Sequence, residues 1–227
     1  MVSSAVKKYA ALCMVCLCSS LFFLGLYQFN NKYSQNTIQA ANGILALSEE
    51  ELQKSPVRFL VSGWAFYPDA LLTPEEIQDE SHYMRYLSIG EQTNFSSPAN
   101  PSPYGCGTYQ MTFFLPERKE TYALEIPEVF SAYNLYLDHD LILQMGEPAQ
   151  GTPLVQNRMV TFHGGKPVTL TIAVSNYDHF YGGIVYPPAF GTMLAVNTTR
   201  GIRFAFCLFS CTVTFVCALL SFYFSRR

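Results

Sequence analysis

The chain has 227 residues and a formal net charge of −3 at pH 7, and its longest uncharged apolar runs lie near its two ends. This uneven distribution argues against one soluble globule formed by the whole chain. Residues 33–199 hold all 17 acidic side chains but only seven basic ones, a net charge of about −10. No nucleic acid partner is expected, because such partners require clustered Lys and Arg.

The first apolar run extends from Tyr9 to Phe29 and contains no charged residue. It is long enough to cross a bilayer, which takes about 20 apolar residues. Lys7 and Lys8 precede it, so the positive-inside rule predicts a cytoplasmic amino terminus. A cleavable signal peptide is the alternative and would also export the middle of the chain, but the usual small-x-small cleavage pattern is missing from residues 22–31.

Residues 33–200 are expected to form one extracytoplasmic domain between membrane segments at residues 1–32 and 201–227. Of the seven cysteines only Cys106 lies in this domain, so a core rather than an internal disulfide must stabilise it. Ser48 with Glu51, and Thr73 with Glu76, have the spacing of helix capping boxes. They predict two short helices near the start of the domain.

The rest of the domain alternates short β-rich runs with turn residues, which predicts an all-β sandwich of nine strands. Alternation from Tyr109 to Leu115 predicts one buried face, and Trp64 is expected in the core. Asp138, His139 and Asp140 are expected to form a hairpin turn. The predicted strands are Val57–Phe66, Tyr83–Ile89, Thr108–Leu115, Tyr122–Ile126, Ala132–Leu137, Leu141–Met145, Arg158–Phe162, Val168–Val174 and Ala189–Ala195.

The sequence contains no recognisable catalytic motif, so we expect neither enzyme activity nor a cofactor. The four histidines, His82, His139, His163 and His179, are scattered, which favours surface or hydrogen-bonded side chains over a metal site. An acidic cluster could bind calcium but lacks a calcium-loop spacing, so a solvated helix face is favoured. This cluster consists of Asp69, Glu75, Glu76, Asp79 and Glu80.

Two long loops, residues 92–107 and 175–188, are candidate binding segments, because loops on a rigid scaffold often carry function. In the second loop Asn176, Asp178, His179 and Tyr181 combine rings with polar groups, which suits a sugar or another small polar ligand such as a carboxylate. The alternative is that these rings pack beneath the loop as a small satellite core.

Several motifs resemble those of one protein family, the extracellular sensor domain, type 2, of bacterial seven-transmembrane receptors with diverse intracellular signalling modules. The resemblance covers about residues 40–195, and it implies a jelly-roll β-sandwich similar to galactose-binding and carbohydrate-binding modules. Tyr104 and Tyr133, which lie in these motifs, complete the predicted ligand-binding set. The motifs are Asn42–Ser48, Gly63–Tyr67, Leu71–Glu75, Tyr104–Tyr109, Leu124–Pro127, Ser131–Leu137, Val174–Tyr177 and Gly182–Ile184.

The resemblance also implies seven membrane helices and an output domain after the sensor, whereas this sequence continues only through one apolar run, Phe204–Ser225. Two interpretations remain open at this point. The chain is either a natural short relative that works through a partner, or a truncated receptor. The turn at Asp138–Asp140 also departs from the Asn-Gly usual for the family, which affects turn stability but not the expected fold.

The expected function is that of a two-pass sensor module in the bacterial cytoplasmic membrane, acting with a small-molecule ligand and a membrane signalling partner. One alternative is a structural subunit that contacts neighbouring membrane proteins through small and hydroxylated side chains of its second helix. An accessory carbohydrate-binding module is another. The helix residues in question are Cys207, Ser210, Cys211 and Thr214.

Overall fold

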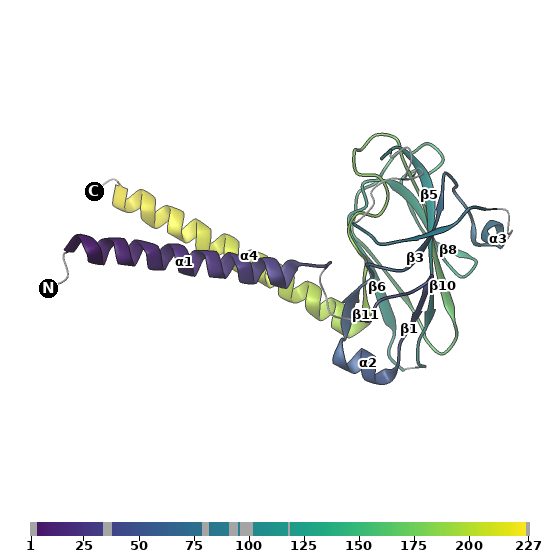
Figure 1. Cartoon of the computed structure of the whole chain (residues 1–227), viewed down its shortest axis with the longest axis horizontal. Helices are drawn as coiled ribbons and strands as arrows, with labels where there is room; N and C mark the ends of the chain where they lie inside the picture. Colours follow the sequence, from purple (N-terminus) through teal and green to yellow (C-terminus); the bar gives the residue numbers. More distant parts are fainter. Residues whose placement is uncertain are drawn as a thin grey trace. The chain divides into compact units, whose positions relative to one another are not determined.

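A computed structural model describes residues 4–33, 38–78, 82–90, 95, 102–117 and 119–225 (Figure 1). The chain divides into two units, residues 1–36 and residues 37–227. The first unit contains helix α1, Ser4–Asn30, whose apolar segment Lys8–Gln28 is long enough to cross a membrane. The second contains the strands and helix α4, Met193–Ser225, in which Met193–Leu219 meets the same criterion.

The second unit is built from two sheets. The larger has the strand order β4-β3-β5-β10-β7-β8, with β1 paired in parallel to β5, and the smaller has the order β2-β11-β6-β9. Every other strand pair is antiparallel. The strands are β1 Ile44–Ala46, β2 Val57–Phe59, β3 Trp64–Pro68, β4 Arg85–Leu87, β5 Gly105–Phe114, β6 Tyr122–Ile126, β7 Ala132–Leu137, β8 Asp140–Met145, β9 Arg158–Phe162, β10 Val168–Asn176 and β11 Ala189–Thr192.

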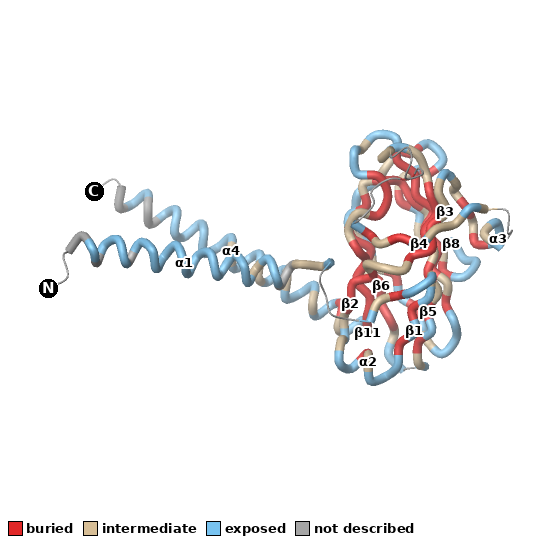
Figure 2. Tube along the Cα trace, viewed as in Figure 1, coloured by how far each residue is buried: buried red, intermediate tan, exposed pale blue. Residues whose placement is uncertain are grey.

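The two sheets share one apolar core, whose buried residues are the red parts of the tube in Figure 2. The Phe113 ring of the larger sheet lies 5.1 Å from the Phe190 ring of the smaller, and Phe190 stacks on Tyr122 at 5.8 Å. As predicted, one face of β5 is buried, and Trp64 is fully buried with its indole Nε1 donating to the Leu60 carbonyl at 3.0 Å. These contacts define a β-sandwich.

Both predicted capping boxes are present. Helix α2, Glu49–Lys54, begins after Ser48, which exchanges hydrogen bonds with Glu51. Helix α3, Pro74–Ile77, begins in the same way after Thr73, which pairs with Glu76. Each box satisfies backbone donors that a helix start otherwise leaves unpaired. Hydrogen bonding in these boxes lowers the pKa of the Glu51 and Glu76 carboxyls.

The strand predicted at Val57–Phe66 is wrong, because this segment crosses from one sheet to the other. Strand β2 pairs with β11 in the smaller sheet, whereas β3 pairs with β5 in the larger. Gly63 permits the crossing with its positive φ of +80°, and a Cβ there would lie 2.1 Å from the Ala40 carbonyl oxygen. Apolar periodicity in the sequence does not report such a sheet change.

The predicted count of nine strands is also wrong, since the described residues form eleven. Besides the split segment, the short strand β1 was missed, because three residues are too few for a periodic pattern. The last predicted strand ends at Thr192 rather than Ala195. There the Thr192 hydroxyl accepts a hydrogen bond from the Ala195 N–H at 3.3 Å, inside the first turn of α4.

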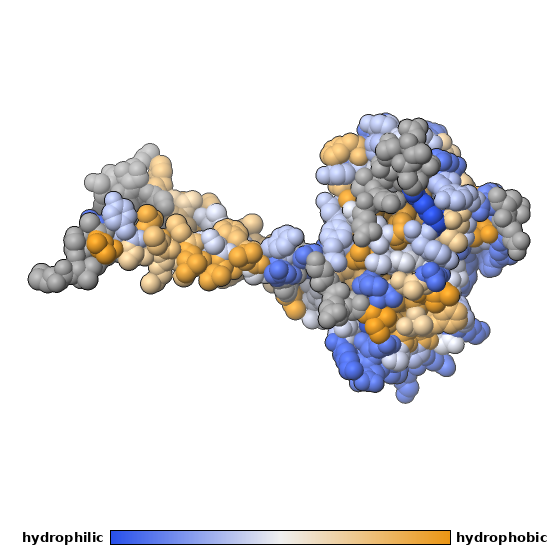
Figure 3. Space-filling model, in the orientation of Figure 1, coloured by the Kyte–Doolittle hydropathy of each residue, from blue (hydrophilic) through white to orange (hydrophobic). Residues whose placement is uncertain are grey.

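Helix α4 therefore starts within the domain rather than at residue 201. The Met193 N–H donates to the Thr121 carbonyl at 2.9 Å, Val196 is buried, and α4 contacts β11, β6 and β2 of the smaller sheet. The Arg203 guanidinium lies 5.1 Å from the centre of the Phe59 ring. The first turns of α4 thus pack on the smaller sheet, and the same helix continues into the apolar run, whose hydrophobic residues are orange in Figure 3.

Candidate functional site

The loop after β10, together with Phe130 just before β7, carries a group of five rings, called here the aromatic cluster. The His179 ring stacks on Phe130 and on Phe180, each at 4.7 Å, and Phe180 lies 4.1 Å from Tyr181. The centres of the Tyr186 and Phe130 rings lie 6.4 Å apart in an edge-to-face arrangement. Phe180 is 62% exposed and Tyr181 37%, so these two rings are open to solvent rather than buried as a satellite core.

Asn176 holds this loop in place. Its side-chain amide donates to the Pro103 carbonyl at 2.8 Å and to the His179 carbonyl, while its Oδ1 accepts from the His179 N–H at 3.0 Å. The Gly183 N–H donates to the Ser131 hydroxyl at 3.2 Å. Phe95 is buried beneath the loop, where an added Cβ at Gly182 would lie 2.9 Å from its ring. The rings therefore sit on a hydrogen-bonded support.

The structure divides the six predicted ligand-binding residues into two groups. Asp178, His179, Tyr181 and Tyr104 are at least partly exposed, and they are available for contact. Asn176 and Tyr133 are fully buried, so neither presents an exposed side chain. Asn176 instead positions the loop.

Tyr133 belongs to the core, since β7 turns its side chain inward. Its hydroxyl has no hydrogen-bond partner within the described part of the chain, and burial raises its pKa to about 12, with a smaller opposing effect of Arg158. Its place in a family motif is the reason why this ring was predicted to contact the ligand. Phe130, missed as a cluster member, stands just before β7 and gave no comparable pattern.

The aromatic cluster lies at the end of the sandwich opposite the start of α4. In the register of β10, Asn176 pairs with Gly105 at one end and Val168 pairs with Phe113 at the other. Thr192, the last residue before α4, pairs with Tyr122 of β6. Tyr122 in turn pairs with Phe162, the last residue of β9, and a short turn connects Phe162 to Val168 at the start of β10. Since β10 has nine residues, roughly 30 Å separate the two ends.

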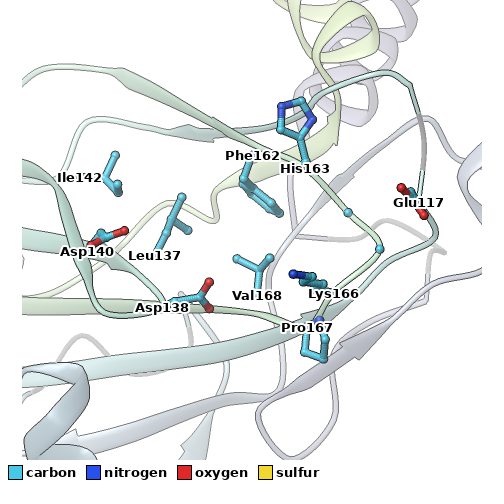
Figure 4. Close-up of a pocket in the computed structure, with 12 residues that line it drawn as sticks. Glu117, Leu137, Asp138, Asp140, Ile142, Phe162, His163, Lys166, Pro167 and Val168 are labelled. Atoms are coloured by element: carbon cyan, nitrogen blue, oxygen red, sulfur yellow. The ribbon is translucent and has the colours of Figure 1, made fainter.

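A pocket of about 580 Å³ lies at the α4 end of the sandwich (Figure 4). The β7–β8 hairpin forms one wall, with Asp138 at a positive φ of +54° in the predicted turn. The β9–β10 turn forms another wall with Lys166, and Glu117 contributes from the β5–β6 loop. No local motif marks this pocket in the sequence, because its segments are far apart in the chain.

No metal site emerges from the geometry: across the described ranges, no three His, Cys, Asp or Glu side chains are grouped to hold an ion. In the acidic cluster, Glu75 and Glu76 are exposed on α3, as expected for a solvated face, whereas Asp79 and Glu80 lie outside the described residues. Much of the first candidate loop, including residues 92–94 and 96–101, also lies outside them. His139 is hydrogen-bonded, with Nδ1 2.8 Å from Glu75 Oε1.

Two threonine hydroxyls of the second helix form hydrogen bonds within the helix itself. Thr214 donates to the Ser210 carbonyl, and Thr212 to the Leu208 carbonyl, each at 2.8 Å. Both hydroxyl protons are thus used within α4. Cys207 and Cys211 are exposed free thiols on the same helix.

No family model matches the chain, and no curated protein matches it in sequence. Its structure is similar to parts of several solved glycosidases. A GH2 β-galacturonidase from Eisenbergiella tayi is 14% identical over 59% of this chain and 24% of the enzyme, with a TM-score of 0.43. A β-glucuronidase from Faecalibacterium prausnitzii is 17% identical over 61% and 32%, with a TM-score of 0.42.

A GH2 member from Bacteroides cellulosilyticus is 12% identical over 60% of this chain and 20% of the enzyme, with a TM-score of 0.47. The chain therefore spans less than a third of the length of each of these three enzymes. What the geometry itself defines is a mostly antiparallel two-sheet domain with an apolar helix at each end of the chain.

Proposed function

We propose that the chain is a ligand-sensing module of a bacterial signal-transduction receptor, anchored in the cytoplasmic membrane by both apolar helices, with its central domain outside. The motifs that resemble the type 2 sensor domain of seven-transmembrane receptors support this reading. In this proposal the sandwich is of the jelly-roll type. Strand order supports that assignment, because β10 lies between β5 and β7 although it follows both in sequence.

The observation that carries the proposal is the exposed aromatic cluster on its fixed loop. Open ring faces give contact area to the apolar face of a sugar, and neighbouring polar groups fix its orientation. Phe180 and Tyr181 provide the rings, and the exposed Asp178 provides a carboxylate. The ligand in this proposal is therefore a small polar molecule such as a carbohydrate.

Helix α4 provides the route by which binding would reach the membrane. It packs on β11, β6 and β2, and its Arg200 Nε lies 3.9 Å from Glu125 Oε1 of β6. A ligand changes the populations of two packing states only if it binds them with different affinity. The proposal therefore requires that the loop and the smaller sheet differ between two states of the sandwich.

The test is calorimetric titration of the full chain in lipid nanodiscs with a panel of mono- and oligosaccharides and small carboxylates. A double variant, Phe180→Ala with Tyr181→Ala, is expected to weaken binding about tenfold, since aromatic contacts contribute about 0.5–1.5 kcal/mol each beyond buried area. Tyr83→Ala is the matched control, because Tyr83 is an exposed ring, at 69%, outside the cluster. Binding that survives the double variant unchanged would contradict the proposal.

A further inference from the structure

The pocket at the α4 end has an acidic wall whose position is fixed. Asp138 is tied twice to β10: its N–H donates to the Thr169 carbonyl at 2.7 Å, and its Oδ1 accepts from the Thr169 N–H at 2.8 Å. Its Oδ2 has no hydrogen-bond partner among the residues described. The carboxylate of Asp140 lines the same wall, likewise without an ion pair in that part of the chain. Two acceptors thus face the pocket on a rigid hairpin.

The opposite wall carries a cation on a turn that is also rigid. The Gly165 N–H donates to the Leu115 carbonyl at 3.1 Å, and Pro167 restricts the backbone after Lys166. In Figure 4 the Lys166 amine and the Asp138 carboxylate point toward each other across Val168. No ion pair joins Lys166 to an acidic group of the described residues, so its ammonium is available.

Apolar side chains lie between these walls. Leu137, Phe162 and Val168 line the pocket and are nearly buried, and Ile142 is exposed at its side. Glu117 stands beside the basic turn, where an added Cβ at Gly165 would lie 3.0 Å from the Glu117 Cβ. With three carboxylates against one lysine, the pocket favours a ligand that carries net positive charge.

From this arrangement we infer that the pocket is a second ligand site, separate from the aromatic cluster, for amino acids or short peptides with a basic side chain. The α-ammonium group binds Asp138 and Asp140, and the α-carboxylate binds Lys166. The aliphatic stem lies on Leu137 and Phe162, and the basic end is directed to Glu117. A volume of about 580 Å³ lies within the usual range for small-molecule sites.

The test uses L-arginine as the probe, titrated calorimetrically into the full chain in nanodiscs. Agmatine, which lacks the carboxylate, and Nα-acetyl-arginine, which lacks the ammonium, are expected to bind about tenfold or more weakly, because each loses a charged hydrogen bond. Equal binding of arginine and agmatine would overturn the inference, since the site would then recognise only a cation.

Variants assign the roles within the pocket. Lys166→Gln should weaken arginine about tenfold or more without weakening agmatine, and Asp140→Asn should weaken both. Asp140→Asn is preferred to Asp138→Asn as the test variant. The Asp138 carboxylate accepts a hydrogen bond from the Thr169 N–H and so supports the turn, whereas no hydrogen bond of the Asp140 side chain is present among the described residues. Glu50→Gln, an exposed acid on α2, is the control and should leave binding unchanged.

The Phe180→Ala, Tyr181→Ala double variant separates this inference from the proposed function, since it should retain arginine binding. The inference of a second site would be overturned if both pocket variants bound arginine with unaltered affinity, or if the unmodified chain did not bind arginine. Neither result would bear on the ligand proposed for the aromatic cluster.

Discussion

The side-chain amide of Asn176 donates to the Pro103 carbonyl at 2.8 Å and so joins two loops that are 73 residues apart in sequence. Asn176 is completely buried at the end of β10, and its amide also closes the turn to His179. One side chain thus fixes the support of the aromatic cluster.

Asn176→Ala should therefore reduce the free energy of unfolding by about 1–3 kcal/mol, because it leaves buried polar groups without partners. Urea denaturation of the full chain in micelles, followed by fluorescence of the single, buried Trp64, measures this change. Gln144→Ala removes an exposed amide that bonds the Gly146 carbonyl, and it should stay within about 0.5 kcal/mol. A similar loss in both variants would contradict the assigned role of Asn176.

Gly182→Ala should disturb the same loop through steric overlap. A Cβ at Gly182 would lie 2.1 Å from the Pro103 carbonyl oxygen, and backbone at that distance must move. We expect a loss of about 1–3 kcal/mol in the same denaturation assay. Gly201→Ala is the matched substitution, since no described atom beyond the neighbouring backbone of its own helix lies within 4 Å of the added methyl group, and there alanine should preserve or raise stability because it favours helix.

Tyr133→Phe should stabilise the domain by about 1 kcal/mol, because it removes a buried hydroxyl that has no partner among the described residues. Tyr122→Phe is its counterpart, since the Tyr122 hydroxyl donates to the Pro116 carbonyl at 2.9 Å, and its loss should cost about 1 kcal/mol. Opposite signs for these two variants are the expected result. A destabilising Tyr133→Phe would show that its hydroxyl is satisfied.

Stability should fall in alkaline solution because burial raises the pKa of Tyr109 and Tyr133 to about 12 from an ordinary value of 10. Both phenols keep their protons in the folded chain at a pH where the unfolded chain loses them. Their contribution is complete below pH 10 and is lost as the pH rises toward about 12. Unfolding free energy measured across this range, with phenolate absorbance, should show the slope, and Tyr133→Phe should reduce it.

Local sequence patterns predicted much of this fold. Strands β6, β7 and β9 have the predicted bounds, because alternation and turn residues mark both of their ends. The capping boxes at Ser48 and Thr73 are equally local, since each depends on two residues in one turn. The crossing at Gly63 was missed because it depends on the distant Ala40 backbone.

The candidate site was less predictable than the fold. The aromatic loop was identified from its composition, but burial of Asn176 and Tyr133 follows from packing against other strands. The pocket joins Glu117, Asp138 and Lys166 from three separate segments. No single stretch of sequence contains the information that these charges converge.

The unbroken course of α4 from Met193 to Ser225 has a mechanical consequence. An α-helix turns by about 100° and rises about 1.5 Å per residue, so the contacts of α4 with the smaller sheet set the direction of every later side chain of the helix. The part of α4 that packs on the sandwich and the apolar segment thus belong to one continuous helix. In the proposed receptor, a tilt or rotation of the sheet at β11 would therefore change the orientation of the apolar segment as well, because no break in the helix separates the two.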